Sequence, residues 1–94
     1  MANDVLIPTP LRVYADKRDV VTVEGGTVGE LLQNLTTQYA ELRNHLYNED
    51  GRLRSFVNVY LNDDDIRYLD KEATTVKDGD ILSIVPSVAG GDDE

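Results

Sequence analysis

One segment of the chain has the pattern of an amphipathic helix, and that helix cannot stand alone. Apolar residues recur at helical spacing from Val28 onward, namely Val28, Leu31, Leu32, Leu35, Tyr39 and Leu42. Such a stripe has to pack against another apolar surface. Thr27 and Glu30 stand in the S/T-x-x-E arrangement of a capping box, which satisfies free amides at a helix start. The sequence therefore predicts a main helix that opens at Thr27 and packs on a sheet built by the flanking segments.

Two strands are expected before this helix. Residues 4–16 ("DVLIPTPLRVYAD") are apolar and β-branched, but Pro8 and Pro10 interrupt them. Strands tolerate proline at their edges and ends. Residues 19–26 ("DVVTVEGG") form a second short strand that stops at a Gly-Gly turn. The pair predicts a hairpin through "ADKRD".

Three more strands are expected after the helix. Residues 55–62 ("SFVNVYLN") alternate apolar and polar side chains, which is the period of a half-buried strand. A short strand around Ile66–Tyr68, a turn at "KDGD" and a last strand in residues 81–89 ("ILSIVPSVA") follow. A helix on one face of a mixed sheet is an α+β architecture. With the last strand central, the order is compatible with a β-grasp domain over residues 1–89 and a tail over residues 90–94.

The composition excludes several classes of function. The chain has 94 residues, which favours one domain, and its 18 acids against 9 bases give a formal net charge of -9. Binding to nucleic acid or to an anionic membrane is not expected, because phosphate contacts need clustered Lys and Arg. Partners should instead present basic patches. No apolar run of membrane-spanning length and no signal-peptide pattern is visible, so a cytoplasmic location is expected.

The side chains offer neither a catalytic set nor a metal site. The absence of cysteine excludes disulfides, thiolate metal ligands and a cysteine nucleophile. His45 is the only histidine and is expected at the surface or at a helix end. The acidic runs at residues 63–65 and 78–80 lack the ligand spacing of an EF-hand loop and are interpreted as solvated turns. No metal and no bound cofactor are predicted.

Two segments near the end of the chain carry a family resemblance. "FVNVYLNDDDIR" and "DGDILSIVPSVAGG" are similar to the ubiquitin-like sulfur carriers of the MoaD/ThiS type, which include the small subunit of molybdopterin synthase and the thiamine sulfur carrier. Members show a "VNxxxxxxD" strand and turn, a "DGDxVxxxPxVxGG" close and a terminal Gly-Gly. The resemblance covers essentially the whole chain. "IPTPLR" and "FVNVYLNDDDIRYL" most resemble the carrier of the O-phosphoserine-dependent cysteine pathway.

The resemblance places the chemistry on the main chain rather than on a side chain. It implies that a ubiquitin-activating-type adenylyltransferase activates the carboxylate of Gly91 with ATP and Mg²⁺. A sulfur donor then displaces AMP and leaves a thiocarboxylate, which supplies a PLP-dependent cysteine synthase or another acceptor enzyme. Gly90 and Gly91 have no Cβ, so such a tail can thread a narrow channel to a buried active site. The chain would thus be a protein cosubstrate and not an enzyme.

Asp92, Asp93 and Glu94 depart from the family's Gly-Gly ending. While they are attached, the carbonyl of Gly91 is part of an amide and cannot be adenylated. The resemblance implies trimming between Gly91 and Asp92 by a zinc metalloprotease of the JAMM type. The three acids could equally be a solubilising tail or a cloning remnant.

The resemblance also implies a docking surface for the activating enzyme. Phe56 and Tyr60 are expected on the strand face opposite Val57 and Val59, which looks away from the helix. Val85 alternates out of register with its apolar neighbours and could join them. Ordinary packing at a sheet edge is an equally good explanation for these three side chains.

Other functions remain open at this point. The chain could be a protein modifier that is joined to target lysines through Gly91, because both functions start from the same adenylate. It could also be the small subunit of molybdopterin synthase or the thiamine carrier. A plain β-grasp interaction domain with an idle Gly90-Gly91 tail is the third possibility, since chain ends are commonly without a role.

Overall fold

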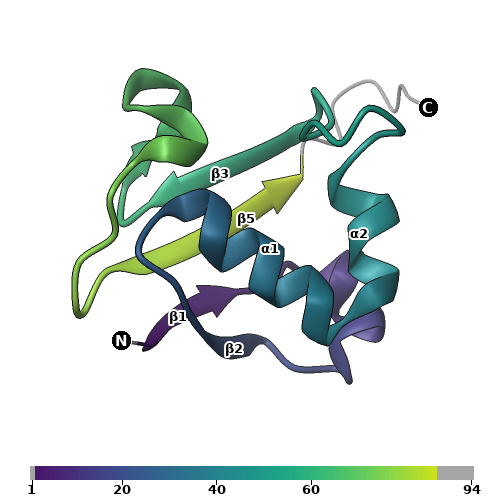
Figure 1. Cartoon of the computed structure of the whole chain (residues 1–94). Coiled ribbons are helices and arrows are strands. Elements are labelled where there is room, and N and C mark those ends of the chain that lie inside the picture. The colour runs from purple at the N-terminus through teal and green to yellow at the C-terminus, as the bar shows by residue number, and fades with distance from the viewer. Residues whose placement is uncertain (1, 87–94) are drawn as a thin grey trace.

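A five-stranded mixed sheet forms one layer of the computed structural model, which describes residues 2–86 (Figure 1). The strands lie in the order β2-β1-β5-β3-β4. Their bounds are β1 Ala2–Leu6, β2 Val20–Glu24, β3 Val57–Leu61, β4 Asp64–Asp65 and β5 Ile81–Pro86. β5 is the central strand, because it pairs in parallel with β1 and antiparallel with β3. The predicted position of the last strand is confirmed.

Two helices, α1 (Val28–Gln38) and α2 (Ala40–Leu46), form the second layer over one face of the sheet (Figure 1). The core between the layers joins helix residues to alternate strand residues; its central members are Val5, Val28, Leu31, Leu32, Leu35, Leu42, Leu46, Val59 and Leu82. This arrangement is the predicted α+β layout of a ubiquitin-like β-grasp fold. Within residues 2–86, neither helix has the length and apolarity that crossing a bilayer requires.

The start of α1 follows the prediction, whereas its continuation does not. Thr27 is the N-cap, and its Oγ1 accepts a hydrogen bond of 3.2 Å from the Glu30 amide. Glu30 Oε1 accepts in return from the amide of Gly26, one residue before the cap, at 2.7 Å. The single helix predicted through Leu42 is wrong, because the backbone leaves the helical conformation at Tyr39 (φ -124°, ψ 85°).

Neighbouring threonines give a physical reason for this break. The hydroxyl of Thr36 donates to the carbonyls of Leu32 and Gln33, and that of Thr37 also donates to Gln33. Such bonds compete with the helical ladder and bend helices. Leu42 is still buried, but it reaches the core from α2. The apolar spacing continues across the break, so periodicity alone did not reveal it.

The first predicted strand is also shorter than expected. β1 ends at Leu6, and Thr9–Ala15 form a 3₁₀ helix that buries Leu11 and Ala15. Pro10 lies in the first turn of that helix, where no backbone donor is needed. β1 and β2 do pair antiparallel, as predicted. The connection between them is this helix rather than a tight hairpin.

The short strand expected at Ile66–Tyr68 is a 3₁₀ helix instead. Asp65 caps it, since its carboxylate accepts from the backbone amide of Arg67 at 2.9 Å. The strand that pairs with β3 is instead β4, which lies immediately before this 3₁₀ helix. The turn predicted at "KDGD" is confirmed, because the Asp80 amide donates to the Lys77 carbonyl at 3.0 Å and Gly79 has a φ of 89°.

Candidate functional site

β5 is the element that leads to the predicted reactive end of the chain. Its side chains Leu82 and Ile84 are buried under the helices, and its last residue, Pro86, pairs with Val57 at the start of β3. The sites predicted at Gly90, Gly91 and Asp92 lie outside the described residues. Threading, processing and thiocarboxylate formation there therefore stay predictions. Leu82 and Ser83 of β5 are paired on both sides, and the pairing with β3 continues to Pro86, the last described residue.

The sheet face opposite the helices carries a set of exposed apolar side chains. Cross-strand pairs put Asp4, Leu6, Thr22, Asn58, Tyr60, Ile81, Ser83 and Val85 on one surface, the open face. Leu6, Ile81 and Val85 are 38%, 40% and 45% exposed. Exposed apolar residues grouped on one face are typical of a surface that binds another protein.

Two of the three predicted docking residues lie on the open face. Val85 is opposite Asn58, and Tyr60 is opposite Ser83, so Val85 and Tyr60 are diagonal neighbours. Phe56 precedes β3 in a turn closed by the Val57 amide and the Arg54 carbonyl, and it is exposed. The predicted placement away from the helices is confirmed for Tyr60 and Val85. Their docking role stays a prediction.

Sequence reasoning missed Leu6 and Ile81 as members of the open face. The signal in β1 was present, because Asn3 and Val5 are buried while Asp4 and Leu6 point the other way. Reading residues 4–16 as one interrupted strand hid this alternation. Ile81 joins the face because it pairs with Asp4, a contact between residues far apart in the sequence.

A network of side-chain hydrogen bonds borders the open face at its β4 edge. Nη2 of Arg67 donates to Asp65 Oδ2 at 2.8 Å and to Asn58 Oδ1 at 2.7 Å. The hydrogen bonds from Arg67 hold the pKa of Asp65 below its ordinary value. Asn58 is therefore oriented by the 3₁₀ helix that follows β4, while it sits opposite Val85 on β5. A partner on this face would meet exposed apolar side chains among polar ones, of which Asn58 is held by Arg67.

The carboxylates of the acidic runs take part in turn structure. Asp80 accepts from the Lys77 amide at 2.9 Å and from Asn62 Nδ2 at 3.2 Å, and both bonds lower its pKa. Within residues 2–86, no group of three His, Asp or Glu side chains is arranged to hold a metal ion. His45 lies in the last turn of α2 and stacks on Tyr14, with 4.0 Å between ring centroids. Its predicted place at a helix end is confirmed.

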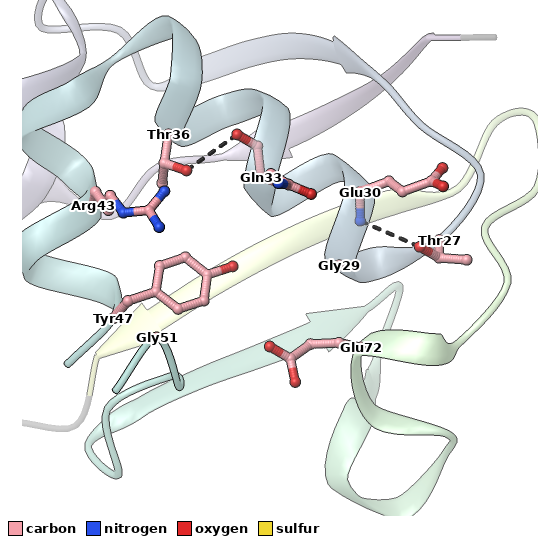
Figure 2. Close-up of a pocket in the computed structure, with 9 residues that line it drawn as sticks. All are labelled: Thr27, Gly29, Glu30, Gln33, Thr36, Arg43, Tyr47, Gly51 and Glu72. Carbon is pink, nitrogen blue, oxygen red and sulfur yellow. Dashed lines mark hydrogen bonds between the residues drawn. The ribbon is translucent and has the colours of Figure 1, made fainter. Parts of the chain in front are cut away.

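A pocket of about 350 Å³ on the helix side lies apart from these predicted sites (Figure 2). Tyr47 extends from the end of α2 towards α1, and Glu72 lies across from its hydroxyl (Figure 2). Burial, and then the charge of Glu72, raises the pKa of Tyr47 to about 12. A Cβ at Gly29 would lie 3.1 Å from the Glu72 carbonyl oxygen, so a side chain there would need the backbone at Glu72 to shift. Of the predicted site residues within 2–86, which are Phe56, Tyr60 and Val85, none lines this pocket.

Comparisons with known proteins agree with this fold. Residues 5–91 match the ThiS family. The sulfur carrier protein CysO of Mycobacterium tuberculosis is 38% identical over 89 residues, which cover 93% of this chain and 96% of that protein. Small archaeal modifier protein 3 of Haloferax volcanii is 38% identical over 89 residues, with 86% and 96% covered. A chain of the crystallised Amycolatopsis orientalis BexX/CysO complex superposes with a TM-score of 0.84 at 40% identity, covering 94% of this chain and 98% of that one. The chain therefore belongs to the ThiS family of ubiquitin-like sulfur carriers, which are β-grasp protein cosubstrates rather than enzymes.

Proposed function

We propose that this chain carries sulfur as a thiocarboxylate on Gly91 and supplies it for cysteine biosynthesis. The observation that supports this most directly is the family match, which runs through Gly91 and stops before the three terminal acids. The likeness to CysO favours the cysteine pathway over molybdopterin or thiamine supply. The reactive atom is then a main-chain carbon, which agrees with a sequence that has no cysteine.

The proposed reaction sequence begins with hydrolysis of the Gly91–Asp92 peptide bond by a JAMM-type metalloprotease. The new carboxylate attacks the α-phosphate of Mg-ATP in a ubiquitin-activating-type partner and releases pyrophosphate. Hydrosulfide from a donor then attacks the carbonyl carbon of the acyl adenylate and expels AMP, which leaves the thiocarboxylate. The product holds a soft nucleophilic sulfur that a PLP-dependent cysteine synthase could accept. Each covalent intermediate divides one difficult transfer into easier steps.

The open face provides a docking surface for the activating partner in this scheme. Leu6, Tyr60 and Val85 would bury apolar area, and the chain's acidity would favour a partner with a basic rim. The BexX/CysO complex shows that a similar protein assembles with another chain.

The direct test is the intact mass of the chain isolated from its native cell. A species that ends at Gly91, with one oxygen replaced by sulfur, would support both trimming and carriage. A population that consists only of chains retaining Asp92, with no sulfur-bearing fraction, would contradict the proposal. A chain truncated before Gly90 that still supports cysteine synthesis would instead favour the idle-tail domain.

A Gly91→Val substitution in a chain that ends at residue 91 should block adenylation without unfolding the domain. The valine side chain would enlarge a tail that has to thread a narrow channel, whereas the buried core is built from residues between Asn3 and Ile84. Pyrophosphate release with the activating enzyme reports the first effect, and the melting temperature reports the second. Normal adenylation of the variant would show that threading does not require glycine.

A role as a protein modifier is the second candidate, and one observation favours it. Small archaeal modifier protein 3 is as similar to this chain, at 38% identity, as CysO is. In that case a lysine amine, rather than sulfur, would attack the adenylate of Gly91. Isopeptide-linked adducts in cells would favour the modifier, and a thiocarboxylate without adducts would favour the carrier.

A further inference from the structure

A groove of about 550 Å³ runs along the helix side of β3, near the point where β5 ends. The floor of this groove is apolar and includes Val57, Val59 and Ile66, all of them buried. One wall is the loop before β3, and the other is formed by the 3₁₀ helices after β4. We call it the basic groove, because its walls carry Arg52, Arg54, Arg67 and Lys71.

The basic groove concentrates positive charge in a protein that is otherwise strongly acidic. It holds four of the nine Lys and Arg residues of a chain with a formal net charge of -9. Two acids also line it: Asp65 is paired with Arg67 at 2.8 Å, which leaves Arg52, Arg54 and Lys71 with Glu72. Arg52 and Lys71 make no ion pair within residues 2–86. Cations above an apolar floor fit a peptide segment that carries both apolar and acidic side chains.

The chain itself has such a segment within reach. Pro86, the last described residue, pairs with Val57 of the groove floor, and Figure 1 shows the β5 arrow ending next to the start of β3. Asp92 follows Pro86 by six residues, which span at most roughly 20 Å when fully extended. Val88 and Ala89 come first, and the acids at residues 92–94 follow. The segment therefore carries both apolar and acidic side chains, the two kinds that suit the floor and the walls.

We propose that the basic groove binds the acidic residues 92–94 of the same chain. Attachment to the domain gives such a segment an effective concentration on the order of millimolar, so a weak site would still be occupied. The effect of this binding on cleavage and activation rests on the carrier function proposed above. Docking would hold Gly91 against the domain and slow cleavage of the Gly91–Asp92 bond, and cleavage would then release the tail for activation.

The test is a comparison of backbone amide spectra by NMR, with the full chain and the chain that ends at Gly91. In low salt, the amides of Arg52, Leu53 and Lys71 should differ between the two. The difference should vanish at about 1 M salt, where the Debye length is about 3 Å. A full-length chain with Asp92→Asn, Asp93→Asn and Glu94→Gln should give the spectrum of the trimmed chain at these positions.

Matched variants decide whether the groove itself is responsible. Arg52→Gln with Lys71→Gln should abolish the difference between full and trimmed chains, whereas Lys77→Gln, at the opposite end of β5, should preserve it. No difference at the groove, or changes confined to residues 83–86 beside the cut, would overturn the proposal. A difference that grows with protein concentration would overturn it in favour of the tail of a second copy.

These measurements use no activating enzyme, so they separate the two proposals. A trimmed chain that accepts sulfur although the groove shows no change would defeat tail docking alone. Groove changes in a chain that never acquires sulfur would defeat the carrier function alone.

Discussion

At the residue scale, Asn3 shows how one buried side chain joins distant parts of this fold. It is 3% exposed, and its Nδ2 donates to the carbonyls of Lys77 and Asp80 at 2.8 and 2.9 Å. The amide thereby ties the first strand to the turn that precedes the last one. The position of β5 next to β1 depends in part on these bonds.

Replacing Asn3 by alanine should lower the free energy of unfolding by about 1–3 kcal/mol, because carbonyls at a partly buried site lose their donor. Urea denaturation measures the loss. Asp4→Ala on the open face is the matched control and should change stability by less than about 0.5 kcal/mol. Equal effects of the two substitutions would show that the Asn3 bonds are not important for stability.

Asp80 should make stability depend on pH in a defined direction. Its folded-state pKa lies below the ordinary value of 3.8, because the Lys77 amide and Asn62 donate to its carboxylate. A carboxyl with a lowered pKa stabilises the fold above its unfolded pKa and loses that effect as pH falls through the folded pKa. The melting temperature of Asp80→Asn should therefore fall below that of the parent at neutral pH. The gap should close as pH drops below 3.8, and a gap that stays constant would contradict this assignment.

At the element scale, the cap of α1 is the feature that sequence reasoning predicted best. A capping box is a local pattern, and both of its hydrogen bonds form within four residues of the cap. The break at Tyr39 and the 3₁₀ helices could not be predicted in the same way. They preserve the apolar spacing while changing the path of the backbone, so a count of apolar positions is unaffected by them.

Thr27→Ala should cost about 0.5–2 kcal/mol of stability, which is the usual range for loss of an N-cap. Thr37→Ala is the matched control on the same helix, because its hydroxyl bonds to a helical carbonyl and alanine is the better helix former. Chemical denaturation of both variants makes the comparison. A Thr27 variant as stable as the Thr37 variant would show that the cap contributes nothing.

At the scale of the whole molecule, the open face should provide affinity for the activating partner. Val85→Thr keeps the β-branched shape but places a hydroxyl in the interface, at a cost of about 1–3 kcal/mol, or roughly 5- to 150-fold in Kd. Val13→Thr makes the same change at an exposed valine of the 3₁₀ helix Thr9–Ala15 and should leave Kd unchanged. Calorimetric titration with the activating enzyme measures the Kd of both variants. If Val85→Thr bound the activating enzyme as tightly as the parent chain does, the docking surface would not include Val85.

The sequence by itself determined the start of α1, the strand β3 and the closing motif of this protein. Helical spacing after Thr27, alternation in β3 and the "DGD" to Gly-Gly close are local, and local periodicity is set by the geometry of the helix and the strand. The tertiary structure decided which residues share a surface. Leu6, Ile81 and Val85 lie on the open face, and Arg52 and Lys71 line one groove, only because strands and loops far apart in the chain pack side by side. Periodicity assigns a side chain to one face of its own strand, whereas the neighbours across that face depend on strand order and register.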